Sequence, residues 1–200
     1  LKLLQAPLAA ACRNLAGFAT KYRSLPCLAY THFQPAQLTT VGKRACLWLQ
    51  DLLGPLETIG ALARDLPFLG VKGTTGTQAS YLALFDGDHA KVKELDRMVA
   101  SKMGFVRSFA VTGQTYPRVL DYQVLSTLGL VAVACHKMAG DIRLLSGLRE
   151  IEEPFGEKQV GSSAMAYKRN PMRCERMASL SRFLLNEVQN AAFTAAEQWL

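Results

Sequence analysis

The chain has 200 residues, of which half are hydrophobic and a fifth are charged. This composition excludes a disordered tail and suffices for the packed core of one domain of ordinary size. There are 23 basic against 16 acidic side chains, so the formal charge is +7 and the surface should favour anions. The apolar uncharged stretch over residues 122–135 is shorter than the roughly 20 residues that span a membrane, so we expect no membrane span.

The cysteines and the chain ends indicate the kind of protein. Five cysteines are scattered and never spaced as C-x-x-C, which predicts neither a disulfide framework nor a zinc site. We expect them to be reduced and to act as small apolar residues, which fits a cytosolic protein. No basic region followed by a cleavage site opens the chain, so we expect no secretory signal peptide. Because the chain lacks an initial methionine and ends inside a predicted helix, we interpret it as part of a longer protein.

In the first third of the chain, apolar residues recur every three or four positions over residues 4–22, which predicts an amphipathic helix. Residues 31–37 are too polar for a core and too interrupted by proline for a helix, so we expect a loop there. Thr39 or Thr40 can cap a second helix. Gly54–Pro55 should kink or break that helix before the apolar pattern continues.

The middle of the chain begins with a Gly/Thr-rich turn over residues 70–80. Asp88 then caps a helix that Gly104 ends, and residues 105–112 form a short β-prone piece. From residue 120 to residue 138, apolar side chains occupy nearly every face of a long predicted helix, and the pattern continues to about residue 148. Because a helix that is apolar all round must be buried on all sides, this pattern indicates packing against helices of other subunits.

The last quarter of the chain contains a second polar loop over residues 150–170. Asn170 as a cap and Pro171 as the first helical residue make a good start for a final helix, which runs to the chain end. Long helices separated by polar loops predict an all-α fold, a long-helix bundle that assembles into a multi-subunit helical core.

Residues 161–171 are the strongest candidate for chemistry. The hydroxyls of Ser162 and Ser163 follow directly after a glycine. A cation, Lys168, comes six residues after the first serine, and the amide of Asn170 lies at the predicted helix start. The positive end and free amides of that helix favour a carboxylate or a phosphate nearby. On composition alone, a flexible basic surface loop explains the segment equally well.

The order of these residues resembles the G-S-S-x-M-x-x-K-x-N stretch of the fumarase/aspartase superfamily. Residues 31–37 resemble its T-H-x-Q-x-A-Q loop, which carries a catalytic histidine, and residues 72–78 resemble its Gly/Thr turn. Within the superfamily the three segments are most similar to the animal-type adenylosuccinate lyases. The resemblance covers essentially the whole chain, so residues 1–200 correspond to a central helical domain whose N- and C-terminal flanking domains are not in the chain.

The resemblance implies a β-elimination of fumarate from adenylosuccinate, giving AMP, and from the succinyl-carboxamide imidazole ribotide of purine nucleotide biosynthesis. It implies no metal and no organic cofactor, because the reaction needs only a base, an acid and charge stabilisation. The implied partners are a small-molecule nucleotide and further copies of the chain, in a homotetramer whose active sites are shared between subunits. A nucleic acid or a membrane is not among them.

The roles of five residues follow from the resemblance by position. Ser162 would be the base that removes the β-proton, and its alkoxide would need help from loop amides and a cation. Lys168 and Asn170 would bind the succinyl carboxylate and stabilise the charge that builds there. His32 would be the general acid towards the leaving nitrogen, and Glu175 would orient His32 and hold it protonated.

The resemblance also implies substrate contacts from Thr31, Ser163, Gln114 and Arg176. For Arg176 a solvated basic face is the competing interpretation, and for Gln114 a loop hydrogen bond. The chain departs from the family at Ala166, where proline is usual. Alanine should populate the open state of the loop more, so Ala166→Pro should raise catalytic efficiency or leave it unchanged.

Other functions remain open on the sequence. A sister enzyme such as argininosuccinate lyase, fumarase or aspartase would use the same loop, and a non-catalytic helical scaffold would keep only the fold. A basic nucleic-acid binder is disfavoured, because no basic run is interleaved with aromatic residues. His89 and His136 stand apart from other ligand-type side chains, so we expect structural or surface roles for both.

Overall fold

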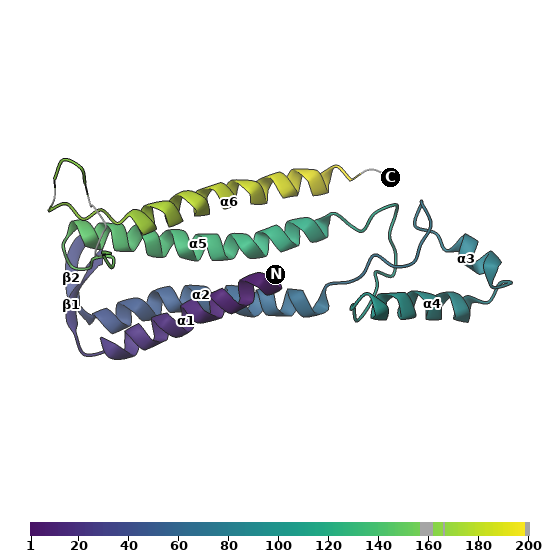
Figure 1. Cartoon of the computed structure of the whole chain (residues 1–200), viewed down its shortest axis with the longest axis horizontal. Coiled ribbons are helices and arrows are strands. Elements are labelled where there is room, and N and C mark those ends of the chain that lie inside the picture. Colours follow the sequence, from purple (N-terminus) through teal and green to yellow (C-terminus); the bar gives the residue numbers. More distant parts are fainter. Residues whose placement is uncertain (157–161, 166, 199–200) are drawn as a thin grey trace.

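The computed structural model describes residues 1–156, 162–165 and 167–198. Four long helices lie side by side as an elongated bundle, with the hairpin at one end and two shorter helices at the other (Figure 1). The long helices are α1 (Lys2–Lys21), α2 (Val41–Asp65), α5 (Val119–Gly147) and α6 (Met172–Ala196); the shorter ones are α3 (Ala79–Leu84) and α4 (His89–Lys102). The predicted long-helix bundle is confirmed, although α3 was not anticipated.

The hairpin consists of β1 (Pro26–Thr31) and β2 (Gln34–Thr40), paired antiparallel from Pro26 opposite Thr40 to Thr31 opposite Gln34. The prediction of an irregular loop over residues 31–37 is therefore wrong. Both strands of a two-stranded sheet are edges, where a proline that lacks an N–H group is tolerated. His32 and Phe33 form the two-residue turn, with φ of 52° and 58°, the left-handed values that a tight hairpin turn requires.

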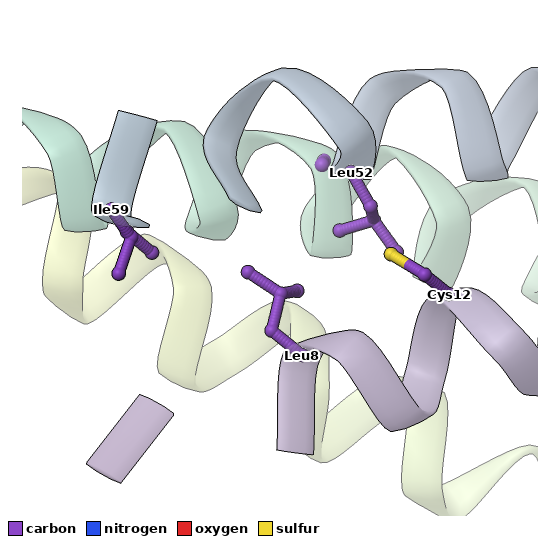
Figure 2. Packing of buried hydrophobic residues seen from close by; sticks show 5 residues of the cluster. Leu8, Cys12, Leu52 and Ile59 are labelled. Carbon is purple, nitrogen blue, oxygen red and sulfur yellow. The ribbon is translucent and has the colours of Figure 1, made fainter. Parts of the chain in front are cut away.

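Small apolar clusters hold the bundle together along its length. Leu8 and Cys12 of α1 pack against Leu52 and Ile59 of α2, with Ala134 of α5 in the same cluster (Figure 2). A second cluster joins α1, α2 and α5, and a third joins α5 to α6 through small residues. Alanine and cysteine at these positions let the helix backbones approach closely, so the helices form a row from α1 through α2 and α5 to α6.

Two predicted helix caps are confirmed and one is not. The Thr40 hydroxyl accepts the Lys43 amide at 3.0 Å, and the Asp88 carboxylate accepts the amides at the start of α4. The capping position of α6 belongs to Pro171 rather than Asn170, so α6 begins one residue later than predicted.

Two further predictions concern Pro55 and residues 105–112. A break at Pro55 is excluded, since α2 continues through it. That proline is itself buried and its neighbours along the helix pack into the core, which compensates for one missing hydrogen bond. Residues 105–112 form no strand. An isolated bridge from Phe68 to Ser108 is the sheet-like pairing found there among the described residues.

α5 is long and apolar enough to cross a membrane by length and composition, which the count of uncharged residues did not anticipate. The core helix of a soluble protein passes the same test, and α5 packs against both α2 and α6. Only 22% of its most apolar window is buried within the chain. Leu130 and Val133 are about half exposed, so the predicted burial of this helix on all sides is not achieved by one chain alone.

Candidate functional site

The candidate residues lie at two opposite ends of the bundle. His32 is on the hairpin, and the serine loop (the described residues 162–165 and 167–170) connects α5 to α6 at the same end (Figure 1). Gln114 lies in the connection from α4 to α5, at the other end. The 29 residues of α5 separate the two ends by about 43 Å, at roughly 1.5 Å per residue. One small substrate therefore cannot contact Gln114 and Ser162 of the same chain.

His32 occupies the tip of the hairpin, where its exposed side chain lines a cavity of about 760 Å³. The hairpin, the start of α2 and the end of α5 enclose this cavity, and Lys43, Arg44 and Asp141 also line it. The backbone of His32 is left-handed, a conformation that histidine adopts more readily than most residues. Thr31, just before the turn, is exposed and pairs with Gln34.

A polar network ties this hairpin to the end of α5. Arg44 donates from Nη1 to Glu150 at 2.9 Å and from Nη2 to the Leu28 carbonyl at 2.7 Å. The Tyr30 hydroxyl donates to the other oxygen of Glu150 at 3.0 Å, and this hydrogen bond is the main reason that the pKa of Tyr30 is raised. Glu150 lies at the entry to the segment that leads into the serine loop, so it fixes the hairpin to that segment.

The polar residues of the serine loop are exposed or half-buried. Ser162 is half-buried, and its hydroxyl accepts the Ala164 amide at 3.3 Å, a local turn of the kind that serines favour. Ser163 and Lys168 are exposed, and Asn170 is half-buried. Ala166, the departure from the family pattern, lies outside the described residues.

The amides at the start of α6 are bound by a carboxylate of the chain itself. Glu153 accepts the Arg173 amide at 3.0 Å and the Cys174 amide at 2.7 Å. Burial would raise the pKa of the Glu153 carboxyl, but the hydrogen bond from the Cys174 thiol, the two amide hydrogen bonds and the Arg173 charge together outweigh burial and lower that pKa. The expectation of free amides at this helix start is therefore wrong for residues 173 and 174. No local motif could reveal the cap, because Glu153 lies 20 and 21 residues away in sequence.

Cys174 shares the environment of Glu153. Burial, followed by the hydrogen bond and the negative charge of Glu153, raises the pKa of the Cys174 thiol to about 12. The thiol is thus neutral at physiological pH and unsuited to nucleophilic chemistry. All five cysteines are free, and the described part of the chain holds no group of three His, Cys, Asp or Glu residues able to bind a metal.

Glu175 and Arg176 follow on the first turns of α6, and both are exposed. Among the described residues no hydrogen bond or ion pair joins Glu175 to His32 of the same chain. Arg176 lines a mainly apolar groove of about 500 Å³ between α1, α5 and α6.

At the far end of the bundle, a half-buried lysine supports the Gly/Thr turn near Gln114. Lys72 donates to the carbonyls of Phe109 at 2.6 Å and Leu69 at 3.2 Å. Burial lowers the pKa of Lys72, partly opposed by the charge of Asp96, which accepts the Val71 amide at 2.5 Å. No local motif reveals this cluster, because its partners come from three separate segments of the chain.

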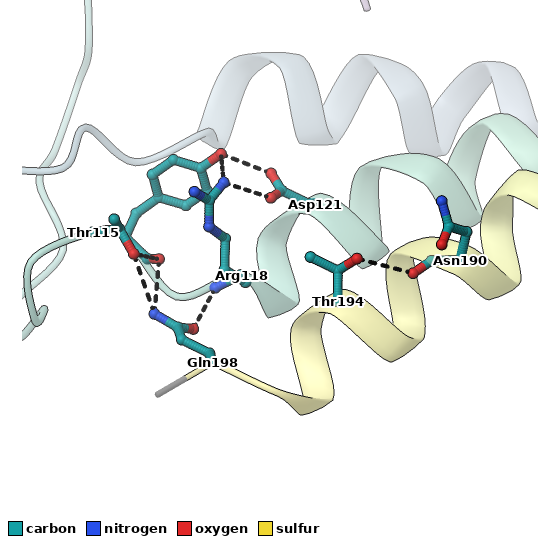
Figure 3. Close-up of polar contacts among 7 residues, drawn as sticks. Thr115, Arg118, Asp121, Asn190, Thr194 and Gln198 are labelled. Atoms are coloured by element: carbon teal, nitrogen blue, oxygen red, sulfur yellow. Dashed lines mark hydrogen bonds and ion pairs between the residues drawn. The ribbon is translucent and has the colours of Figure 1, made fainter. Parts of the chain in front are cut away.

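The end of α6 closes against the start of α5 beside this turn. Gln198 accepts the Arg118 amide at 2.7 Å and donates to the Tyr116 carbonyl at 3.2 Å (Figure 3). Arg118 and the Tyr116 hydroxyl both contact the Asp121 carboxylate. These contacts fix residues 115–118, which follow directly on Gln114.

Comparisons with known proteins agree with the sequence resemblance. A family model described as lyase matches residues 3–183. Adenylosuccinate lyase of Schizosaccharomyces pombe is 56% identical over 93% of this chain and 39% of its own length. Adenylosuccinate lyase of Saccharomyces cerevisiae is 57% identical over the same shares, and that of Schistosoma mansoni is 49% identical over 100% of this chain and 42% of its own length. The chain thus spans about two fifths of these relatives.

Solved structures share the fold. The 3-carboxy-cis,cis-muconate lactonizing enzyme of Pseudomonas putida matches with a TM-score of 0.80 and 24% identity, over 99% of this chain and 41% of that one. Class II fumarase of Schistosoma mansoni matches with a TM-score of 0.75 and 17% identity, over 98% of this chain and 44% of that one. These structures show the fold alone, and by its match to the family model over residues 3–183 the chain belongs to the lyase family.

Proposed function

We propose that this chain is the central helical domain of a lyase that releases fumarate from adenylosuccinate, and from the succinyl-carboxamide imidazole ribotide, in purine nucleotide biosynthesis. The observation that carries the proposal is the 56–57% identity to two adenylosuccinate lyases over 93% of the chain. The substrate is a small nucleotide, and its negative charge suits a chain with a formal charge of +7.

The serine loop supplies the base and the charge stabilisation. Ser162 removes the proton from the carbon beside a carboxylate, while Lys168 and Asn170 bind that carboxylate as negative charge accumulates on it. One preorganised donor of this kind is typically worth about 3–4 kcal/mol of transition-state stabilisation. Ser163 adds a second hydroxyl to the substrate contacts of the loop.

The acid comes from the hairpin. His32 donates a proton to the leaving nitrogen, and Glu175 orients it and keeps it protonated. Within one chain no hydrogen bond or ion pair joins these two side chains. We therefore propose that His32 of one copy lies beside Glu175 of another copy. Thr31, Gln114 and Arg176 complete the substrate contacts, with Arg176 suited to a phosphate or carboxylate by its fork of donors.

The assembly we propose is a homotetramer in which each site combines residues of different subunits. The exposed apolar side chains of α5 and the distance between Gln114 and Ser162 support it. Sedimentation of the isolated chain should show association, and a stable, folded monomer would count against this assembly. We further propose a cytoplasmic location, since five free cysteines suit a reducing compartment.

The test uses full-length protein and follows fumarate release by absorbance, with adenylosuccinate and argininosuccinate offered separately. Turnover of adenylosuccinate is expected, and turnover of argininosuccinate alone would refute the proposal. Ser162→Ala and His32→Gln should each lower kcat about a hundredfold or more. Ser101→Ala and His89→Gln, exposed positions on α4, are the matched controls and should retain full activity.

A further inference from the structure

Glu153 joins two parts of the chain that the serine loop separates. Its two carboxylate oxygens accept the Arg173 and Cys174 amides, although the serine loop lies between Glu153 and these two residues in sequence. A second pair of contacts lies beside it, because Arg169 lies 4.9 Å from the centre of the Phe155 ring and 4.0 Å from the Glu152 carboxylate. Residues 152–155 and 169–174 thus form a closed neck at the base of the serine loop.

The neck bears directly on the residues that we place at the site. α6 begins at Met172, and the Glu175 amide donates to the Pro171 carbonyl at 3.0 Å, so Glu175 lies in the first turn. The first amides of a helix have no partner within the helix, and a first turn without a cap frays. The position of Glu175, and of Arg176 after it, therefore depends on the cap that Glu153 provides.

Within the neck, the contacts of Glu153 hold the start of α6 more firmly than those of Glu152. Its bonds of 2.7 and 3.0 Å are charge-assisted, and the shorter one, from the buried Cys174, is partly buried, which makes this cap strong and geometrically specific. The Glu152 carboxylate is 59% exposed and its ion pair with Arg169 is 4.0 Å long, a pair that contributes little.

We propose that Glu153 is a positioning residue for the lyase reaction, which holds the start of α6 so that Glu175 and the end of the serine loop keep their places at the site. The inference rests on the proposed function. Glu153 contacts no substrate; it acts through the helix start. The Glu153 carboxylate occupies the amides of this helix start. They therefore hold the helix in position and do not bind a carboxylate of the substrate.

The experiment compares Glu153→Ala and Glu153→Gln with the control Glu152→Gln in full-length protein. Glu153→Ala should lower kcat about tenfold or more with KM within about threefold, because misplaced groups affect the transition state most. The alkaline limb of its kcat profile should shift to lower pH, since the general acid loses the carboxylate that keeps it protonated. Glu153→Gln keeps one acceptor and should recover part of kcat, and Glu152→Gln should match the unmodified protein.

Hydrogen exchange of the Arg173 and Cys174 amides provides a readout independent of activity. Exchange should rise in Glu153→Ala, and unchanged exchange, or raised exchange with unaltered kcat and pH profile, would overturn the inference. If Glu153→Ala does not fold, hydrogen exchange and kcat with its pH profile are measured on Glu153→Gln instead, and the same outcomes support or overturn the inference. If the unmodified protein does not turn over adenylosuccinate, the proposed function and the role of Glu153 in the reaction are both refuted. If it is active and Glu153→Ala leaves kcat and the pH profile unchanged, only this inference is refuted.

Discussion

Arg44 and Glu150 form an ion pair of 2.9 Å that connects the start of α2 to the segment leading into the serine loop. The pair is well shielded, since the Arg44 side chain is 16% exposed and that of Glu150 24% exposed. Arg44 also holds the Leu28 carbonyl, so one guanidinium joins the hairpin, α2 and the end of α5.

Arg44→Ala should therefore lower the free energy of unfolding by about 1–3 kcal/mol, because it leaves a carboxylate and a carbonyl without their donor. The matched control is Arg97→Ala on α4, whose partner Glu94 is half exposed. That exposed pair should contribute little, because solvent screens the two charges and the long side chains lose entropy in pairing. Urea unfolding followed by circular dichroism measures both, and equal losses would contradict the structural role of Arg44.

Gly76 and Gly87 offer a test of local packing with nearly the same backbone. Their φ values are 83° and 84°, but a Cβ on Gly76 would lie 1.8 Å from the Thr112 carbonyl, whereas one on Gly87 would meet open space. Gly87→Ala should cost about 1–2 kcal/mol from its left-handed backbone. Gly76→Ala should lower the free energy of unfolding by at least about 3 kcal/mol, because its Cβ must also displace the backbone of the segment that leads to Gln114. Thermal unfolding of the two variants checks the difference, and similar values would refute it.

The separation of Gln114 from Ser162 predicts complementation between inactive proteins. Full-length Gln114→Ala and Ser162→Ala, each impaired alone, should regain part of their activity when unfolded and reassembled together. Some sites then receive an intact glutamine from one chain and an intact serine loop from another. The measurement is fumarate release before and after mixing.

Ser162→Ala with Lys168→Ala is the control mixture for that experiment. Both changes lie on the serine loop, so every site that uses one loop keeps one defect and the mixture should stay inactive. Recovery in this control, or none in the first mixture, would show that the sites are not divided between chains as proposed.

The lowered pKa of Glu153 predicts how stability depends on pH. A carboxyl whose pKa is lower in the folded state contributes stability above its ordinary pKa, and that contribution disappears as pH falls through the folded value. The difference in unfolding free energy between the unmodified protein and Glu153→Gln should thus be largest near neutral pH and shrink below about pH 4. Urea unfolding at a series of pH values measures it, and a difference independent of pH would exclude a charged cap.

The caps of α2 and α4 were predictable because each is a local signal. Thr40 and Asp88 bond amides two or three residues ahead, so the residue type and its place before an apolar period are enough. The cap of α6 was not, since its acceptor comes from 20 residues upstream and only folding brings Glu153 to the helix.

The hairpin was missed for a related reason. Its strands carry polar side chains and Pro35, a composition that is typical of a loop. Whether such residues form a strand depends on the neighbouring strand with which they pair, as Tyr30 does with Pro35. Thr31, His32 and the candidate residues of the serine loop could be named from the order of residues in two short segments, and the others by position in the same resemblance, but all their roles stay predictions.

The sequence by itself determined the four long helices and α4, the caps of α2 and α4, and the family, because helical periodicity and motif order are properties of short stretches of chain. Only the tertiary structure decided that Gln114 lies a helix length from Ser162, that Glu153 closes the serine loop and that Arg44 binds Glu150. These are spatial relationships between distant segments, and their geometry is set by how the helices pack rather than by any residue's neighbours in sequence.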